Sequence, residues 1–326
     1  MSDQTIDPYQ RLQIVRNDNG TITRLLKLPD TPASPDPTLP NSPDVLSKDV
    51  LLDQSKSTWV RIYLPCHALD NSSTSSSSRL PLVVNFHGGG FITFSASSSL
   101  VHDFALNSAA QLSAVLVSVE YRLAPEHRLP AAYEDAMDAL HWIRSAEDDW
   151  LRSHADLAQC FLMGGSAGAN IAYHAGLRAA AEAQSLEPIK FRGLILHQPF
   201  FGGAQRSGSE LRLVNDLVLP LSVSDLMWEL ALPVGVDRDH EYCNLTAGDG
   251  GFKGLELIGS LEWKVLVTGC DGDPLFDRQI EFVKMLEGKG VRVVAHFGEG
   301  EYHGVELVDT SKAKLLNVAI QNFMSS

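Results

Sequence analysis

A serine in a tight glycine-rich turn is the residue of this sequence best suited to chemistry. The segment Gly164-Gly165-Ser166-Ala167-Gly168 directly follows the apolar run 161–163. That run predicts a buried strand, and the alanine-rich stretch after the turn, 169–181, predicts a helix. A serine on a sharp strand-to-helix turn has an exposed hydroxyl, and flanking glycines leave room for the backbone to double back. Ser166 is therefore the candidate nucleophile, although a G-x-S-x-G match alone is only moderately specific.

A second glycine-rich segment, His87-Gly88-Gly89-Gly90-Phe91, follows the apolar run 82–86. Acyl transfer places negative charge on the former carbonyl oxygen, and that oxygen needs aligned N–H donors. The backbone N–H groups of Gly88, Gly89 and Gly90 could supply them, with Ala167 as a further donor. The alternatives are a plain glycine-rich turn or a phosphate cradle. No Lys-Ser/Thr pair follows and no G-x-G-x-x-G opens a helix here, so nucleotide binding is disfavoured.

An acid and a histidine that could activate the serine follow later in the chain. Three carboxylates come after the predicted strand 264–268, namely Asp271, Asp273 and Asp277. Asp273 precedes a proline, which holds its backbone extended where the strand ends, so it is the preferred acid. Asp271 remains a rival. Asp277 falls in the first turn of the next helix, where its negative charge interacts favourably with the helix dipole. His303 lies in a glycine-bearing loop after the last predicted strand and can reach both the serine and the acid.

The remaining histidines predict no second centre of reactivity. His197 lies at the end of a predicted strand and is interpreted as a structural residue. His240 and Cys243 have a spacing that could suggest a metal, but no second pair of ligands accompanies them. The sequence therefore predicts neither a metal nor another cofactor.

The elements that must position these residues alternate between strands and helices. Strands are predicted at 59–64, 82–86, 114–120, 160–163, 193–197, 264–268 and 291–297, and helices near 101–112, 130–145, 169–184, 274–287 and 311–323. Apolar strands that alternate with helices predict an α/β fold, a mostly parallel sheet with helices on both faces. Active sites of such sheets lie at the carboxyl ends of the strands.

Two segments outside this alternation predict a cap over the active site within a single domain spanning 1–326. One is the insertion at about 205–250, which carries a helix-like run at 223–232, and the other is the N-terminal segment at about 1–45. A surface excursion without a role is the alternative for the insertion. Phe91, Leu226 and Trp228 are candidates for lining the substrate pocket, with plain packing as the alternative. Residues 31–47, rich in proline, predict an irregular connection, and the serine-rich stretch 72–78 predicts a hairpin tip.

Composition and charge narrow the class of partner. The chain has 326 residues, 44% of them hydrophobic, and a formal net charge of −14. An acidic surface disfavours nucleic acid and anionic membranes, so an uncharged or cationic small molecule is the expected partner. Four widely spaced cysteines indicate free thiols, and neither a signal peptide nor an apolar run of 18 residues is present. We expect a cytoplasmic protein that is a monomer or a weak homodimer.

With these motifs located, the chain resembles the plant carboxylesterases of the hormone-sensitive-lipase branch of the α/β-hydrolase fold. Beyond the serine turn and the HGGGF segment, the run 121–136, YRLAPEHRLPAAYEDA, is highly specific to that branch. The family's D-P-L-x-D stretch matches 273–277, and its Y-H-G matches 302–304. The resemblance thus implies Ser166 as nucleophile, Asp273 as acid and His303 as base. It also implies a serine carboxylesterase that hydrolyses esters of small to medium hydrophobic molecules through an acyl-enzyme. Gly165 departs from the family, in which Asp or Glu is common before the serine.

The same family includes proteins that do other things with this fold. Gibberellin receptors keep the pocket but lack the catalytic histidine, and dehydratases and alkaloid cyclases carry out eliminations or rearrangements in it. The presence of Ser166 and His303 argues against a pure receptor. A dehydratase or cyclase acting on a specialised metabolite remains the alternative to hydrolysis.

Overall fold

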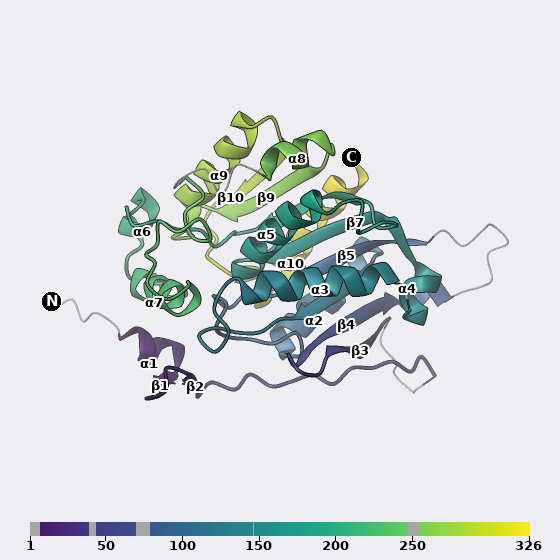
Figure 1. The fold of residues 1–326 in the computed structure, drawn as a ribbon, viewed down its shortest axis with the longest axis horizontal. Helices are drawn as coiled ribbons and strands as arrows, with labels where there is room; N and C mark the ends of the chain where they lie inside the picture. The colour runs from purple at the N-terminus through teal and green to yellow at the C-terminus, as the bar shows by residue number, and fades with distance from the viewer. Residues whose placement is uncertain (1–6, 39–43, 70–78, 146, 247–253) are drawn as a thin grey trace.

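A central eight-stranded sheet forms the framework of the computed structural model, which describes residues 7–38, 44–69, 79–145, 147–246 and 254–326 (Figure 1). The strand order is β10-β9-β8-β7-β5-β6-β4-β3. The strands are β3 (Val45–Asp53), β4 (Thr58–Pro65), β5 (Leu80–Phe86), β6 (Val115–Glu120), β7 (Ala155–Gly165), β8 (Phe191–His197), β9 (Lys264–Cys270) and β10 (Arg292–Gly298). β4 is antiparallel to both β3 and β6. The other six strands, β5 to β10, run parallel to one another. The predicted α/β class is confirmed.

All seven predicted strands are present, and the sheet gains an eighth, β3, at its edge. Residues 45–47, predicted to be irregular, begin this strand. Beyond them its side chains alternate between half-buried and exposed, and Lys48, Asp49 and Asp53 are charged. An edge strand needs little apolar content because one of its sides faces solvent. The predicted hairpin tip at 72–78 lies outside the described residues.

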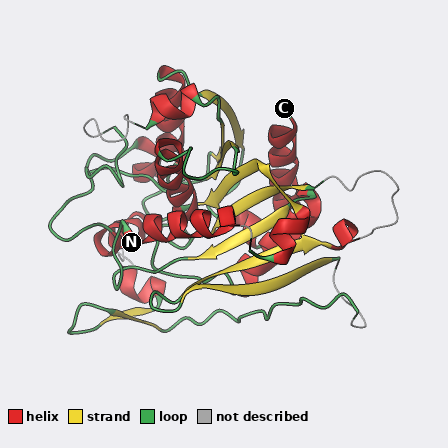
Figure 2. Cartoon of the chain, turned by 45° about the vertical axis from the view of Figure 1, so that its right-hand side comes forward, coloured by secondary structure: helices red, strands yellow, loops and turns green. Residues whose placement is uncertain are grey.

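Helices cover both faces of the sheet (Figures 1 and 2). α3 (Ala131–Ser145), α5 (Ala167–Ala181) and α9 (Phe276–Gly288) pack on one face, and α2 (Ser99–Leu112) and α10 (Thr310–Ser325) on the other. Short helices α4 (Asp149–His154) and α8 (Leu255–Ser260) and the 3₁₀ turns 66–69 and 305–307 complete the connections. Each predicted helix is found within a few residues of its expected bounds. Two cores result, one under each layer of helices.

Residues 7–24 of the N-terminal segment and the 205–246 part of the insertion lie together beyond the carboxyl edge of the sheet, whereas residues 25–38 run along the side of the sheet that β3 forms (Figure 1). The first contains α1 (Pro8–Leu12) and the hairpin β1 (Ile14–Arg16) with β2 (Ile22–Arg24). The second contains α6 (Gly208–Arg212) and α7 (Leu221–Ala231), the helix predicted there. α1 contacts α7. Segments more than two hundred residues apart in sequence thus meet over the ends of the strands.

Candidate active site

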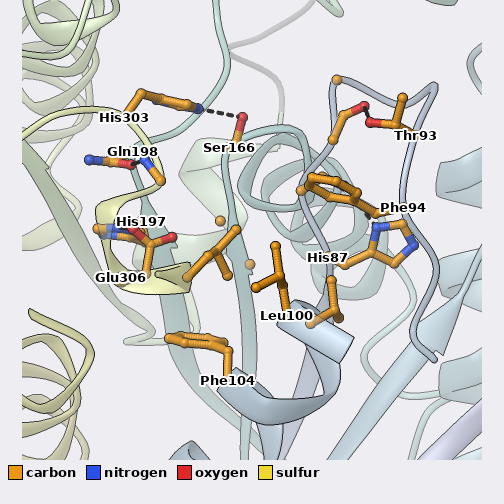
Figure 3. Close-up of a pocket in the computed structure, with 18 of the residues that line it drawn as sticks. His87, Thr93, Phe94, Leu100, Phe104, Ser166, His197, Gln198, His303 and Glu306 are labelled. Carbon is orange, nitrogen blue, oxygen red and sulfur yellow. Dashed lines mark hydrogen bonds and ion pairs between the residues drawn. The ribbon is translucent and has the colours of Figure 1, made fainter. Parts of the chain in front are cut away.

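Ser166 occupies the turn between β7 and α5. Its backbone has φ 54° and ψ −120°, and its N–H donates to the carbonyl of His197 at 2.9 Å. The glycines around it are required by close packing: a Cβ on Gly168 would lie 1.9 Å from the carbonyl oxygen of Phe86, and one on Gly164 would lie 2.2 Å from the carbonyl of Gly168. α5 therefore begins hard against the end of β5, and the serine side chain is directed into the cavity (Figure 3).

The predicted acid and base meet this serine. His303 Nε2 lies 2.9 Å from Ser166 Oγ, and His303 Nδ1 lies 2.9 Å from Asp273 Oδ2 (Figure 3). His303 and Asp273 are both buried. The chain of contacts from carboxylate to imidazole to hydroxyl has the geometry of a nucleophile activated by a general base.

Asp273 is held in place by two donors. The N–H of Leu275 donates to its Oδ1 at 2.9 Å, and the buried amide of Gln279 donates to its Oδ2 at 2.8 Å. The two rival acids are engaged elsewhere. Exposed Asp271 accepts from the N–H of Gly300 at 2.7 Å, and Asp277 accepts from the N–H of Ser209 at 2.7 Å.

The electrostatic surroundings of His303 favour its charged form. Burial lowers the pKa of the imidazole, but the negative charge of Asp273, its hydrogen bond and the nearby Glu306 outweigh that effect. The net pKa of His303 is raised above its ordinary value of 6.5. An imidazole that readily takes a proton suits the removal of a proton from Ser166.

The loop that carries His303 rests on a residue the sequence analysis did not single out. Buried Gln198 accepts from the N–H of Gly304 at 2.7 Å, and its amide lies 3.3 Å from the carbonyl of Tyr302. Gln198 directly follows β8, so its position at a carboxyl strand end was the available signal. It fixes the backbone on both sides of the histidine.

The predicted donor loop lies beside the serine. A Cβ on Gly88 would be 3.4 Å from the Cβ of Ser166, and Gly89 and Gly90 have φ of 105° and 61°. Within the described residues, no hydrogen bond engages the N–H groups of Gly88, Gly89, Gly90 or Ala167. The carbonyl of Gly89 instead accepts from the N–H groups of residues 92 and 93 and from the Thr93 hydroxyl. The loop is thus held by its carbonyls while its N–H groups are free for a ligand.

Tyr121 and Glu120 hold the residues on either side of this glycine loop. His87 stacks on Tyr121 with ring centroids 4.3 Å apart, and the Tyr121 hydroxyl donates to the His87 carbonyl at 2.8 Å. Burial lowers the pKa of His87 to about 4, so its ring is neutral. The Glu120 carboxylate accepts from the N–H of Ala96 and the hydroxyl of Ser95, and burial raises its pKa to about 7.

A cavity of about 620 Å³ opens over Ser166. Its outer part is lined by the N-terminal segment and the insertion, including Leu26, Leu28 and Leu219. Its inner part extends between the sheet and the helices α2 and α10. The apolar residues there are Leu100, Val101, Phe104, Met163, Ile195, Leu316 and Ile320. Ser166 and His303 stand on the wall of this cavity (Figure 3).

The three residues predicted to line the pocket pack elsewhere. Phe91, Leu226 and Trp228 are buried and are not among the residues that line this cavity. The rings of Phe91 and Trp228 lie 5.4 Å apart, and Phe200 stacks on Trp228 at 4.7 Å. Because α7 turns this apolar face to the core, its neighbouring residue Met227 reaches the cavity instead.

Two polar residues in the cavity wall were missed or assigned another role. Glu306, which is 8% exposed, follows His303 by about one turn, and its Oε2 lies 3.0 Å from Nε2 of His197. Nδ1 of His197 lies 2.7 Å from the Thr268 hydroxyl. Burial raises the pKa of Glu306, but the His197 and His303 rings outweigh it, so the pKa is lowered and the carboxyl is ionised. His197 therefore belongs to the site as well as to the strand end.

The described residues contain no group of three or more ligands arranged to hold a metal ion, and His240 and Cys243 take part in none. No disulfide joins the four cysteines, all of which lie among the described residues. No helix in the described part of the chain has both the length and the apolar content to cross a bilayer.

Comparisons with known proteins point to the same chemistry. A family model described as alpha/beta hydrolase fold matches residues 83–307. The chain is 54% identical over 321 residues to Carboxylesterase 20 of Arabidopsis thaliana, covering 98% of this chain and 97% of that protein. It is 43% identical over 326 residues to 3-O-acetylpapaveroxine carboxylesterase CXE2 of Papaver somniferum, covering 98% and 99%. The structure of an esterase from Pyrobaculum calidifontis is similar with a TM-score of 0.69 at 25% identity, covering 86% of each chain.

Proposed function

From the premise that this chain belongs to the plant carboxylesterases of the α/β-hydrolase fold, in their hormone-sensitive-lipase-like branch, and is a carboxylic ester hydrolase, we propose a serine mechanism with an acyl-enzyme intermediate. The observation that carries this proposal is the contact of His303 Nε2 with Ser166 Oγ at 2.9 Å, backed by buried Asp273. An intact imidazole at this distance argues against a receptor that does not hydrolyse.

In the first half of the reaction, Ser166 Oγ attacks the ester carbonyl carbon as His303 Nε2 takes its proton. Asp273 stabilises the imidazolium that forms through Nδ1–H. The N–H groups of the Gly88–Gly90 loop and of Ala167 donate to the oxyanion, and each such donor is typically worth about 3 kcal/mol in the transition state. His303 then gives its proton to the departing alcohol oxygen, and the carbonyl re-forms as the acyl-serine ester.

In the second half, water attacks the acyl carbon while His303 removes one of its protons. Collapse of the second tetrahedral intermediate breaks the bond to Ser166 Oγ, which regains the proton from His303. The products are the free carboxylic acid and the original enzyme. No cofactor takes part in these steps.

We further propose that the N-terminal segment and the insertion act as the cap that selects the substrate. Both contribute apolar side chains to the outer part of the cavity, and a cavity of about 620 Å³ suits small to medium hydrophobic esters. In this proposal, substrate selection rests on Leu26, Leu28, Leu219 and Met227 rather than on the buried trio Phe91, Leu226 and Trp228.

The proposal is tested by labelling and turnover together. A fluorophosphonate probe should increase the mass of the intact protein by one bound probe, and peptide mapping should place it on Ser166. A p-nitrophenyl acyl ester should give an initial burst of p-nitrophenol. Ser166→Ala should lower kcat by roughly 10⁴- to 10⁶-fold. Ser145→Ala, at an exposed helix end, serves as the matched control and should retain full activity. Labelling at another residue, or turnover unaffected by Ser166→Ala, would defeat the mechanism.

A further inference from the structure

Glu306 and His197 form a buried ion pair in the cavity wall whose hydrogen-bond geometry is poor. Oε2 of Glu306 and Nε2 of His197 are 3.0 Å apart, yet within the described residues neither atom makes a hydrogen bond of acceptable geometry. Buried polar atoms in folded proteins nearly always have a partner. Two such atoms, paired by charge but misaligned for a hydrogen bond and both on residues that line the cavity, leave hydrogen-bonding capacity for a ligand.

The position of the pair places it within reach of a bound ester. Figure 3 shows His303, Gln198, His197 and Glu306 along one side of the cavity, with Thr93, Phe94 and His87 along the other. Gly165 leaves the space beside the nucleophile open, because a Cβ there would stand 3.9 Å from both the Oε1 of Glu306 and the ring of His197. The pair therefore lies next to the residue that directly precedes the nucleophile.

The protonation of the pair follows from its contacts. A lone pair on Nε2 of His197 would face an ionised carboxylate at 3.0 Å, which is repulsive, so Nε2 carries a proton. Nδ1 can then accept from the Thr268 hydroxyl, which lies 2.7 Å away. An N–H donor of His197 and the carboxylate of Glu306 thus lie side by side in the cavity wall. A hydroxyl group, which both donates and accepts, complements the two together.

We propose that Glu306 and His197 form a subsite that binds a hydroxyl group on the ester substrate, so that this enzyme selects hydroxylated esters over their purely aliphatic counterparts. The inference rests on the proposed function, because the pair would bind the hydroxyl while the ester group of the same substrate lies against Ser166. The surrounding apolar residues bind the carbon skeleton, and the pair recognises the single polar group on it. A site built to hydrogen-bond a hydroxyl discriminates strongly against analogues that lack it.

The experiment compares matched substrates on one enzyme. For the acyl side, the probes are p-nitrophenyl hexanoate and its derivatives hydroxylated at carbon 3 or carbon 6, positions from which the hydroxyl does not readily form a lactone. For the alcohol side, they are hexyl acetate and 6-hydroxyhexyl acetate. At least one hydroxylated ester should exceed its parent in kcat/KM by about tenfold or more. In Glu306→Leu this ratio should fall to about 1, because the acceptor is gone and apolar esters are bound better.

The ratio within one variant cancels any effect of Glu306 on the Ser166–His303 step. Glu306→Gln, which keeps the shape but loses the charge, should lower the ratio about threefold or more and covers the case in which the leucine variant fails to fold. The exposed pair His141–Glu182 supplies the control, and Glu182→Leu should keep the wild-type ratio.

Three outcomes would overturn the inference. They are no preference for any hydroxylated ester in the wild type, an unchanged ratio in the Glu306 variants, and a stronger preference for amine-bearing esters than for hydroxylated ones. An enzyme that hydrolyses every ester without preference leaves the serine mechanism intact. Failure of the phosphonate to label Ser166 is a failure of the proposed function instead.

Discussion

His303 is the residue whose pKa depends most on the carboxylates of this site. Asp273 contacts its Nδ1 from one side, and the ionised Glu306 adds a second negative charge to its surroundings. Two carboxylates near one buried imidazole favour its protonated form, which is the form that appears during the attack of Ser166. The same charges set the pH at which the free enzyme is ready to act.

The pH dependence of kcat/KM should therefore show an acid limb that lies higher than an ordinary histidine would give. A protonated His303 cannot accept the serine proton, so activity rises with pH through the pKa of this residue, which is raised above 6.5. Glu306 has a lowered pKa and stays ionised across this range. In Asp273→Asn the limb should move to lower pH, and in Glu306→Gln it should move in the same direction by less. A wild-type midpoint below 6.5 would contradict this account.

Sequence reasoning reached some residues of the site and missed others for a physical reason. Ser166, Asp273 and His303 each follow a predicted strand in a recognisable local motif, so their convergence at one edge of the sheet could be expected. The structure brings these three together. Gln198 and Glu306 act through partners 104 to 109 residues away, and no local pattern marks such a contact.

At the scale of elements, the site depends on how closely α5 approaches β5. The start of this helix meets the end of the strand with no room for a single methyl group at Gly168. The approach sets the distance between the donor loop after β5 and the nucleophile before α5. A shift of the helix would therefore separate the serine from the N–H groups that we propose as its oxyanion donors.

Gly168→Ala should destabilise the protein by roughly 3 kcal/mol or more, because its Cβ would lie 1.9 Å from the backbone oxygen of Phe86. Gly288→Ala is the matched control, since this glycine ends α9 with nothing within 4 Å of an added Cβ. It should be neutral or stabilising by up to about 1 kcal/mol. Urea unfolding followed by fluorescence measures both, and equal midpoints for the two variants would show that the contact is unimportant.

The elements themselves were largely predictable, because buried parallel strands are read from short apolar runs between helices. Two features were not predicted: a strand with low apolar content, and the face of a helix that packs against the core. β3 was missed because it is a partly exposed edge strand. α7 was predicted, but the face it turns to the core was not, so Trp228 was assigned to the pocket in place of Met227.

At the scale of the whole molecule, Arg24 ties the N-terminal segment to the loops beside the active site. Its Nε donates to the carbonyl of Ile92 at 2.6 Å, and its Nη2 donates to the carbonyl of Ala124 and to Glu126, both at 2.8 Å. Arg24 also lines the cavity. One side chain thus joins the N-terminal segment, which we propose as part of the cap, to the loop that follows the glycines 88–90.

Arg24→Leu should raise KM by roughly tenfold and change kcat by less than about threefold, because it loosens the cover without touching the reacting groups. Arg16, in the same hairpin, makes only an exposed contact with Glu229 at 3.6 Å. Arg16→Leu is therefore expected to leave both constants unchanged. Steady-state kinetics on one p-nitrophenyl ester tests the pair, and identical effects of the two substitutions would show that the N-terminal segment does not shape the site through Arg24.

The backbone angles of Ser166 carry an implication for how such a protein can change over time. At φ 54° and ψ −120°, a residue with a Cβ is under strain of roughly 1 to 3 kcal/mol, and glycine would adopt the same angles freely. Selection for thermal robustness alone would thus replace this serine with glycine. A serine kept at such a strained position is therefore explained by the chemistry that we propose for its hydroxyl.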